Sequence, residues 1–146
     1  MGISDFNDKS YLYRAIIEGI DLELYHAMQR MQKRSGQHIR EIYIAGGGSV
    51  SDAVVQICCD VFGLPIKRIQ THEASGIGSS IAAFVSMGEF SSYYEAVKSM
   101  VHDRDVFMPN MENHAVYMQL YNDVYRHMEK SNTWLFRRLR KFAKER

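Results

Sequence analysis

The chain has 146 residues, of which 46% are apolar and 24% charged, with two prolines and a formal net charge of +1 at pH 7. Such a chain forms one domain with a hydrophobic core, and its charge excludes a chain-wide attraction to nucleic acid or to anionic membrane. No apolar run has the length of a membrane span, and the first residues lack the pattern of a signal peptide, so we expect a cytoplasmic protein without membrane or nucleic-acid partners.

The first predicted element is a long helix from Ser10 to about Ser35, after a terminus of ten residues without periodicity that we expect to be disordered. Apolar side chains recur along this helix every three or four positions, at Leu12, Ile16, Ile20, Leu24, Met28 and Met31. Gly36 suits a left-handed cap. Gly19 lies in the middle of the helix, where glycine costs roughly 1 kcal/mol relative to alanine, so we expect another group to approach the helix there.

A buried strand is predicted over residues 39–45, and it leads into three consecutive glycines at 46–48, the glycine turn. A helix from Asp52 to Phe62 follows, with Ser49, Ser51 and Asp52 as candidate caps. Glycines without a Cβ and unpaired N–H groups at a helix start suit either a structural tight turn or contact with a nucleotide or another anionic ligand. The turn matches neither the phosphate loop nor the dinucleotide fingerprint, so both interpretations remain open.

The two cysteines, Cys58 and Cys59, are neighbours within this predicted helix. Successive helical side chains point about 100° apart, which excludes an ordinary disulfide between them. Cys58 falls on the apolar stripe of the helix, and we expect it to pack as a small hydrophobic side chain.

A second strand is predicted over residues 66–70, which makes a parallel β-α-β unit with the first. A turn then opens into a helix rich in small residues, namely Gly76, Gly78, Ser79, Ala82 and Ala83. Such a helix either packs tightly on a neighbouring backbone or forms a wall beside a ligand, and we expect packing to be its direct role.

The C-terminal third is predicted to hold a short helix capped by Ser91 or Ser92, a loop over residues 102–110 and a long helix over residues 112–130. Tyrosines recur in the long helix every fourth residue, which indicates core and rim packing. The last segment, 131–146, predicts a basic helix with an apolar side. It suits a membrane surface or an acidic partner, but we expect Trp134, Leu135 and Leu139 to pack on the body and the basic side to face solvent.

Six segments stand in a recognisable order: residues 13–19 (YRAIIEG), the glycine turn with Ser51 and Gln56 beyond it, residues 59–66 (CDVFGLPI), residues 73–78 (EASGIG), residues 87–90 (MGEF) and the tyrosine-rich helix. Together they resemble the C-terminal half of the second domain of the FGGY carbohydrate kinases, which include xylulose, ribulose, gluconate and glycerol kinases. The likeness covers about residues 11–128.

The resemblance implies an α/β fold, the C-terminal part of an actin-like, ribonuclease-H-like ATPase domain, helix-rich with a short parallel β-α-β unit. It implies a partial adenosine-binding domain over residues 11–130, followed by the basic helix at 131–146. It assigns nucleotide contact to five residues, Gly46, Gly47, Gly48, Ser51 and Asp52, and supporting roles to Glu18, Gly19, Glu73 and Ala74. The asparagine of glycerol kinases is absent here, so the contact expected from the glycines is through the main chain.

The family's catalytic aspartate and phosphate loops lie upstream of the matched region, so the resemblance implies neither a catalytic residue nor a metal ligand in this chain. We expect part of an ATP-dependent sugar kinase that is inactive alone, with ATP and Mg²⁺ as cofactors and the sugar bound by a missing N-terminal domain. The alternative is a free-standing interaction or regulatory module that retains the fold. Two parallel strands would leave an exposed sheet edge, from which we expect a homodimer.

Overall fold

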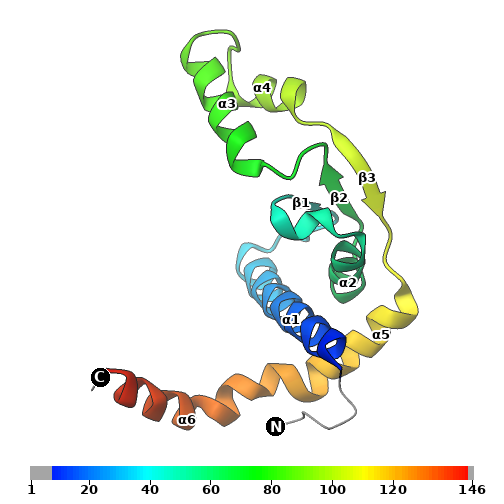
Figure 1. Cartoon of the computed structure of the whole chain (residues 1–146), viewed down its shortest axis with the longest axis vertical. Helices are drawn as coiled ribbons and strands as arrows, with labels where there is room; N and C mark the ends of the chain where they lie inside the picture. The colour runs from blue at the N-terminus through cyan, green and yellow to red at the C-terminus, as the bar shows by residue number, and fades with distance from the viewer. Residues whose placement is uncertain (1–7, 145–146) are drawn as a thin grey trace.

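The computed structural model describes residues 8–144, and its elements alternate between helices and short strands. Their order is α1 (Lys9–Ser35), β1 (Ile42–Ile44), the 3₁₀ turn η1 (Gly47–Val50), α2 (Asp52–Phe62), β2 (Ile66–Ile69), α3 (Ala74–Ser86), α4 (Tyr93–Met100), β3 (Asp103–Phe107), α5 (Met111–Leu120), the π-helical turn η2 (Tyr121–Tyr125) and α6 (Arg126–Lys144). The sheet, α1 and α2 lie centrally, α3 and α4 extend from one end, and α5, η2 and α6 form a long helical rod at the other (Figure 1).

The sheet has three strands in the order β1-β2-β3. β1 and β2 pair in parallel, with Ile42 opposite Ile66, and α2 makes the connection between them, which confirms the predicted β-α-β unit. β3 pairs antiparallel to β2, with Phe107 opposite Ile66. The predicted loop over residues 102–110 is therefore wrong at 103–107. Three of the five β3 residues are charged, so the segment lacks an apolar strand pattern, and its pairing with β2 defines it as a strand.

The third strand also corrects the expectation of a sheet with only two parallel strands. β3 covers one edge of β2, whereas β1 has no strand partner on its outer side within residues 8–144. The predicted strand at 39–45 is shortened to Ile42–Ile44, and the expected homodimer stays a prediction.

The core consists of two clusters of buried side chains that share helix α2. One joins α1, α2, α5 and η2 through Leu22, Val61, Tyr117 and Tyr121, and the other joins α2 to the sheet through Val55, Cys58, Cys59 and Ile66. Both cysteines are free and buried, which confirms the packing role predicted for Cys58. The tyrosine spacing is confirmed as core and rim packing, because Tyr117 and Tyr121 are buried and Tyr125 packs against them.

The expected packing of the C-terminal helix on the body is wrong. Trp134, Leu135 and Leu139 are 66%, 43% and 55% exposed. Helix α6 continues directly from η2 instead of starting anew at residue 131, and it runs along the rod away from the sheet (Figure 1). Because α6 continues along the direction of α5, its apolar side chains lie beyond the core and do not pack on it. No helix within residues 8–144 is long and apolar enough to cross a membrane.

Tight packing of the small residues on α3 is also not observed. The residues in question, Gly76, Gly78, Ser79, Ala82 and Ala83, are all exposed. Helix α3 instead contacts α4 and buries Ile81, while Phe84 meets Phe90 edge to face at 6.3 Å. The larger apolar side chains of α3 thus form its packed side. On α1, similarly, a Cβ added at Gly19 would meet nothing within 4 Å, so the close approach expected there does not occur within this chain.

Candidate functional site

The glycine turn leaves β1 through a backbone conformation that only glycine adopts readily. Gly46 has φ +93°, and its N–H donates to the carbonyl of His72 at 3.0 Å. Its own carbonyl accepts from the N–H of Ser49 at 3.0 Å and from the Ser49 hydroxyl at 2.7 Å. These bonds fix the turn internally and attach it to the segment that follows β2.

Gly47 and Gly48 form the open part of the turn. A Cβ added at either position would meet nothing within 4 Å. Their N–H groups are the first of the 3₁₀ turn and accordingly have no acceptor within it, and the hydrogen bonds between described residues include no other acceptor for them. The turn therefore presents two free main-chain donors and room for another molecule to approach them.

A buried arginine on β2 bonds to the end of the glycine turn and to the first residue of α2. Arg68, on β2, is only 4% exposed, and its Nη1 lies 2.8 Å from both the Ser49 carbonyl and the Asp52 carboxylate. Its Nε and Nη2 donate to the two carboxylate oxygens of Asp105 at 2.8 and 2.5 Å. The hydrogen bonds that Arg68 donates to Asp105 and then to Asp52 raise the pKa of Arg68 above its usual range, and Arg68 in turn lowers the pKa of Asp105.

This arrangement changes the role predicted for Asp52. Its carboxylate is held by Arg68, so its charge is compensated at a place where a free carboxylate would repel an anionic ligand. Ser51 occupies the N-cap position of α2, but its side chain makes no capping hydrogen bond and is exposed. The Ser49 hydroxyl turns to Gly46, so none of the candidate caps forms a side-chain cap of α2.

The supporting residues fall into two groups. Glu73 and Ala74 belong to the segment that reaches the turn, because the carbonyl of His72 accepts from both Gly46 and Ala74 at 3.0 Å. Glu18 instead accepts from Arg14 Nε and from the Tyr117 hydroxyl, both at 2.8 Å. Glu18 thus ties α1 to α5, and these bonds do not reach the glycine turn.

An apolar cavity of about 360 Å³ opens beside the turn, between α1, the end of β1 and α2. Its lining residues are Tyr13, Ile16, Ile17, Ile20, Asp21, Ile44, Ala45, Gly48, Ser49, Val54 and Cys58. Asp21 is 6% exposed, and its Oδ2 has no hydrogen-bond partner among the described residues. Sequence reasoning missed this carboxyl, although its spacing from Ile17 and Met28 places it on the buried side of α1.

Burial raises the pKa of Asp21 from 3.8 to about 6, while a hydrogen bond with the Cys58 thiol partly opposes that rise. The folded state therefore prefers the protonated carboxyl, and the stability that it contributes is complete below about pH 4 and lost as the pH rises through about 6. We expect the free energy of unfolding to fall by on the order of 2 kcal/mol over this interval.

Urea unfolding at intervals from pH 4 to pH 7 measures this dependence, and Asp21→Asn is the matched variant because its amide does not ionise. The difference between parent and variant isolates Asp21 from the other groups that titrate in this range. Parallel pH profiles for the two proteins would contradict the assignment.

The described residues contain no group of three His, Cys, Asp or Glu side chains that could hold a metal ion. The glycine turn can donate main-chain hydrogen bonds to a ligand. Beside it lie the Asp52 carboxylate, which is paired with Arg68, and the apolar cavity.

Comparison with known proteins identifies a family. Residues 1–87 match the FGGY family of carbohydrate kinases, C-terminal domain. Xylulose kinase from Staphylococcus epidermidis is 35% identical over 122 residues, which cover 84% of this chain and 24% of that protein. The structure of ligand-bound xylulose kinase from Lactobacillus acidophilus superposes with a TM-score of 0.75 and 25% identity, covering 91% of this chain and 26% of the other.

Plasmodium falciparum glycerol kinase, solved with ADP, shares the fold, with a TM-score of 0.67 at 16% identity, over 87% of this chain and 26% of that one. The chain thus spans about a quarter of the length of the curated relatives it matches. The match over more than half of the sequence, together with the superposition, confirms the predicted fold class. The chain belongs to the FGGY family of carbohydrate kinases, within its C-terminal domain.

Proposed function

We propose that this chain supplies the adenosine-binding part of an ATP-dependent sugar kinase, and that the glycine turn contacts the nucleotide. The observation that carries the proposal is the pair of free N–H groups at Gly47 and Gly48, with open space where their Cβ atoms would be. Main-chain N–H groups at the start of a helical turn bind phosphate oxygens well, because they are fixed donors that need no side chain.

Two neighbouring features support a nucleotide at this position. Arg68 pairs with Asp52, which partly offsets the negative charge at the entrance to the turn. The exposed hydroxyl of Ser51 borders the same helix start. The glycerol kinase of the same fold that was solved with ADP is consistent with this class of ligand.

Phosphoryl transfer also requires a base for the sugar hydroxyl and a metal that neutralises the developing charge. In the family that this chain resembles, the base and the phosphate loops lie upstream of the matched region. We therefore expect the isolated chain to bind ATP or ADP weakly and to show no turnover with any sugar.

Replacing Gly47 with alanine is expected to weaken ADP binding at least tenfold, because the new methyl group occupies the space from which a ligand reaches the turn. The fold should tolerate the change. Gly47 is not among the glycines with positive φ, and an alanine in an ordinary conformation reduces the entropy of the unfolded chain, so stability should be equal or higher by about 0.5 kcal/mol.

Isothermal titration calorimetry with ADP measures the effect, and Gly78→Ala is the control because its Cβ also meets open space but lies on α3. Equal ADP affinity for the parent, Gly47→Ala and Gly78→Ala would refute contact at the turn. Absence of ADP binding to the parent at millimolar concentration would refute a preformed site in this chain.

A further inference from the structure

A second concave site lies between α1 and the junction of η2 with α6, remote in the sequence from the glycine turn. Three cavities of about 430, 510 and 360 Å³ adjoin there, and His26 lines all of them. Arg30 lines the first and third, and Arg126 lines the second and third. We call this continuous surface the basic groove, and its charged and imidazole side chains are Glu23, His26, Arg30, Arg34, Arg126 and His127.

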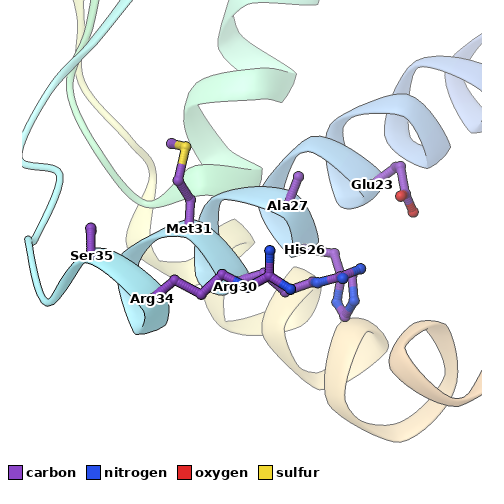
Figure 2. Close-up of a pocket in the computed structure, with 7 residues that line it drawn as sticks. All are labelled: Glu23, His26, Ala27, Arg30, Met31, Arg34 and Ser35. Carbon is purple, nitrogen blue, oxygen red and sulfur yellow. The ribbon is translucent and has the colours of Figure 1, made fainter.

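The basic groove carries an excess of uncompensated positive charge. Among the side chains that the structure describes, which do not include Glu129, no ion pair involves Arg30, Arg34 or Arg126. In Figure 2 the side chains of Arg30 and Arg34 both extend along α1 in the direction of His26. Guanidinium groups arranged in this way offer paired N–H donors that match the oxygens of a phosphate group.

The histidine in the groove is held in a fixed orientation. Its Nδ1 lies 2.7 Å from the hydroxyl of Tyr121, which is 9% exposed and packs edge to face on Tyr25 at 5.0 Å. The Nε2 atom, on the other side of the ring, makes no hydrogen bond with any described side chain. Because the tyrosine belongs to the core, the imidazole is positioned by the fold and not by the exposed surface.

The carboxylate of Glu23, the one acidic side chain among the described residues that line the groove, is fixed as well. Glu23 accepts a hydrogen bond from the Tyr125 hydroxyl at 2.8 Å. Within the π-helical turn, Tyr125 stacks on Tyr121 at 6.3 Å, and the hydroxyls of both reach α1. Single π-helical turns within α-helices are rare and frequently mark functional sites.

We propose that the basic groove binds a phosphorylated small molecule that also carries hydroxyl groups. The phosphate lies against Arg30 and Arg126, which line the same cavity as Glu23, and Arg34 adds positive charge in the adjoining one. The hydroxyl groups donate to the oxygen of Glu23 that does not accept from Tyr125. The Glu23 carboxylate selects a ligand with hydroxyl groups over a bare anion, because it repels any second negative charge.

The site is independent of the proposed nucleotide contact. None of its lining residues lines the cavity beside the glycine turn. A failure of one proposal therefore leaves the other intact, provided that the two sites are tested with separate variants.

The test is a titration of the full chain with glucose 6-phosphate, followed by calorimetry, with glucose as the uncharged comparison. We expect saturable binding of glucose 6-phosphate and at least tenfold weaker binding of glucose. Arg30→Glu and Arg126→Glu, one from each wall, should each weaken glucose 6-phosphate binding at least tenfold. Arg40→Glu makes the same change of charge at an exposed position outside the groove and should leave the affinity unchanged.

Gly47→Ala separates this site from the nucleotide site, and it should keep the affinity of the parent for glucose 6-phosphate. If Arg30→Glu and Arg40→Glu lost equal affinity for glucose 6-phosphate, the loss would come from the overall charge of the protein, and the proposal would be overturned. Equal binding of glucose and glucose 6-phosphate would overturn it as well.

Discussion

Replacing Gly63 with alanine is expected to lower the free energy of unfolding by about 3 kcal/mol. Gly63 ends α2 in the left-handed conformation, with φ +63°, and its N–H donates to the Cys59 carbonyl at 2.9 Å. A Cβ at this position would lie only 2.5 to 2.7 Å from the ring of His114. That ring cannot move freely, because its Nδ1 lies 3.0 Å from the carbonyl of Asp60.

Gly36 provides a matched control for this experiment. It ends α1 in the same conformation, with φ +70°, but a Cβ there would meet nothing within 4 Å. Gly36→Ala should therefore show the conformational strain alone, about 1 kcal/mol. Urea unfolding of both variants separates strain from steric overlap, and equal losses in the two would show that the contact with His114 is relieved without cost.

Replacing Asp60 with alanine should have an effect of similar size, a loss of about 3 kcal/mol. Asp60 is 5% exposed, and its Oδ1 accepts from Gln56 Nε2 and from the N–H of Asn110, both at 2.8 Å. Its Oδ2 accepts from Asn113 Nδ2, also at 2.8 Å. Through these bonds one carboxylate of α2 fixes the start of α5, and its removal leaves several donors without an acceptor.

Asp103→Ala is the comparison for this variant. Asp103 is exposed and lies 3.6 Å from Lys67, a surface pair that contributes less than about 0.5 kcal/mol. Chemical denaturation of both proteins under one set of conditions gives the difference. A loss below about 1 kcal/mol for Asp60→Ala would mean that water replaces the carboxylate, and it would contradict the assigned role.

The sequence predicted those elements whose own residues determine them. The boundaries of α2, the glycine caps and the parallel pairing of β1 with β2 follow from local apolar periodicity and from turn residues, and the structure confirms them. The family resemblance is confirmed too, because it rested on several motifs in order and not on the glycine turn alone.

What the sequence did not predict depends on partners far along the chain. β3 is a strand through its pairing with β2, and the side chains of α6 are exposed because the rod carries them away from the core. The importance of Arg68 could not be read from its position either. Its three partner residues lie at 49, 52 and 105, and only the folded sheet brings them together. The nucleotide contacts and the homodimer stay predictions.

Arg68 has a consequence for the order in which this chain folds. Its guanidinium group joins the glycine turn to β3, across 56 positions from Ser49 to Asp105, so the turn gains this support only after the antiparallel pair has closed. Closure of long loops is the slow part of folding, because the chain loses entropy before it gains contacts. The full set of contacts that supports the surface proposed for the nucleotide is therefore complete only once β3 has paired with β2, although the sequence of the turn itself is short and local.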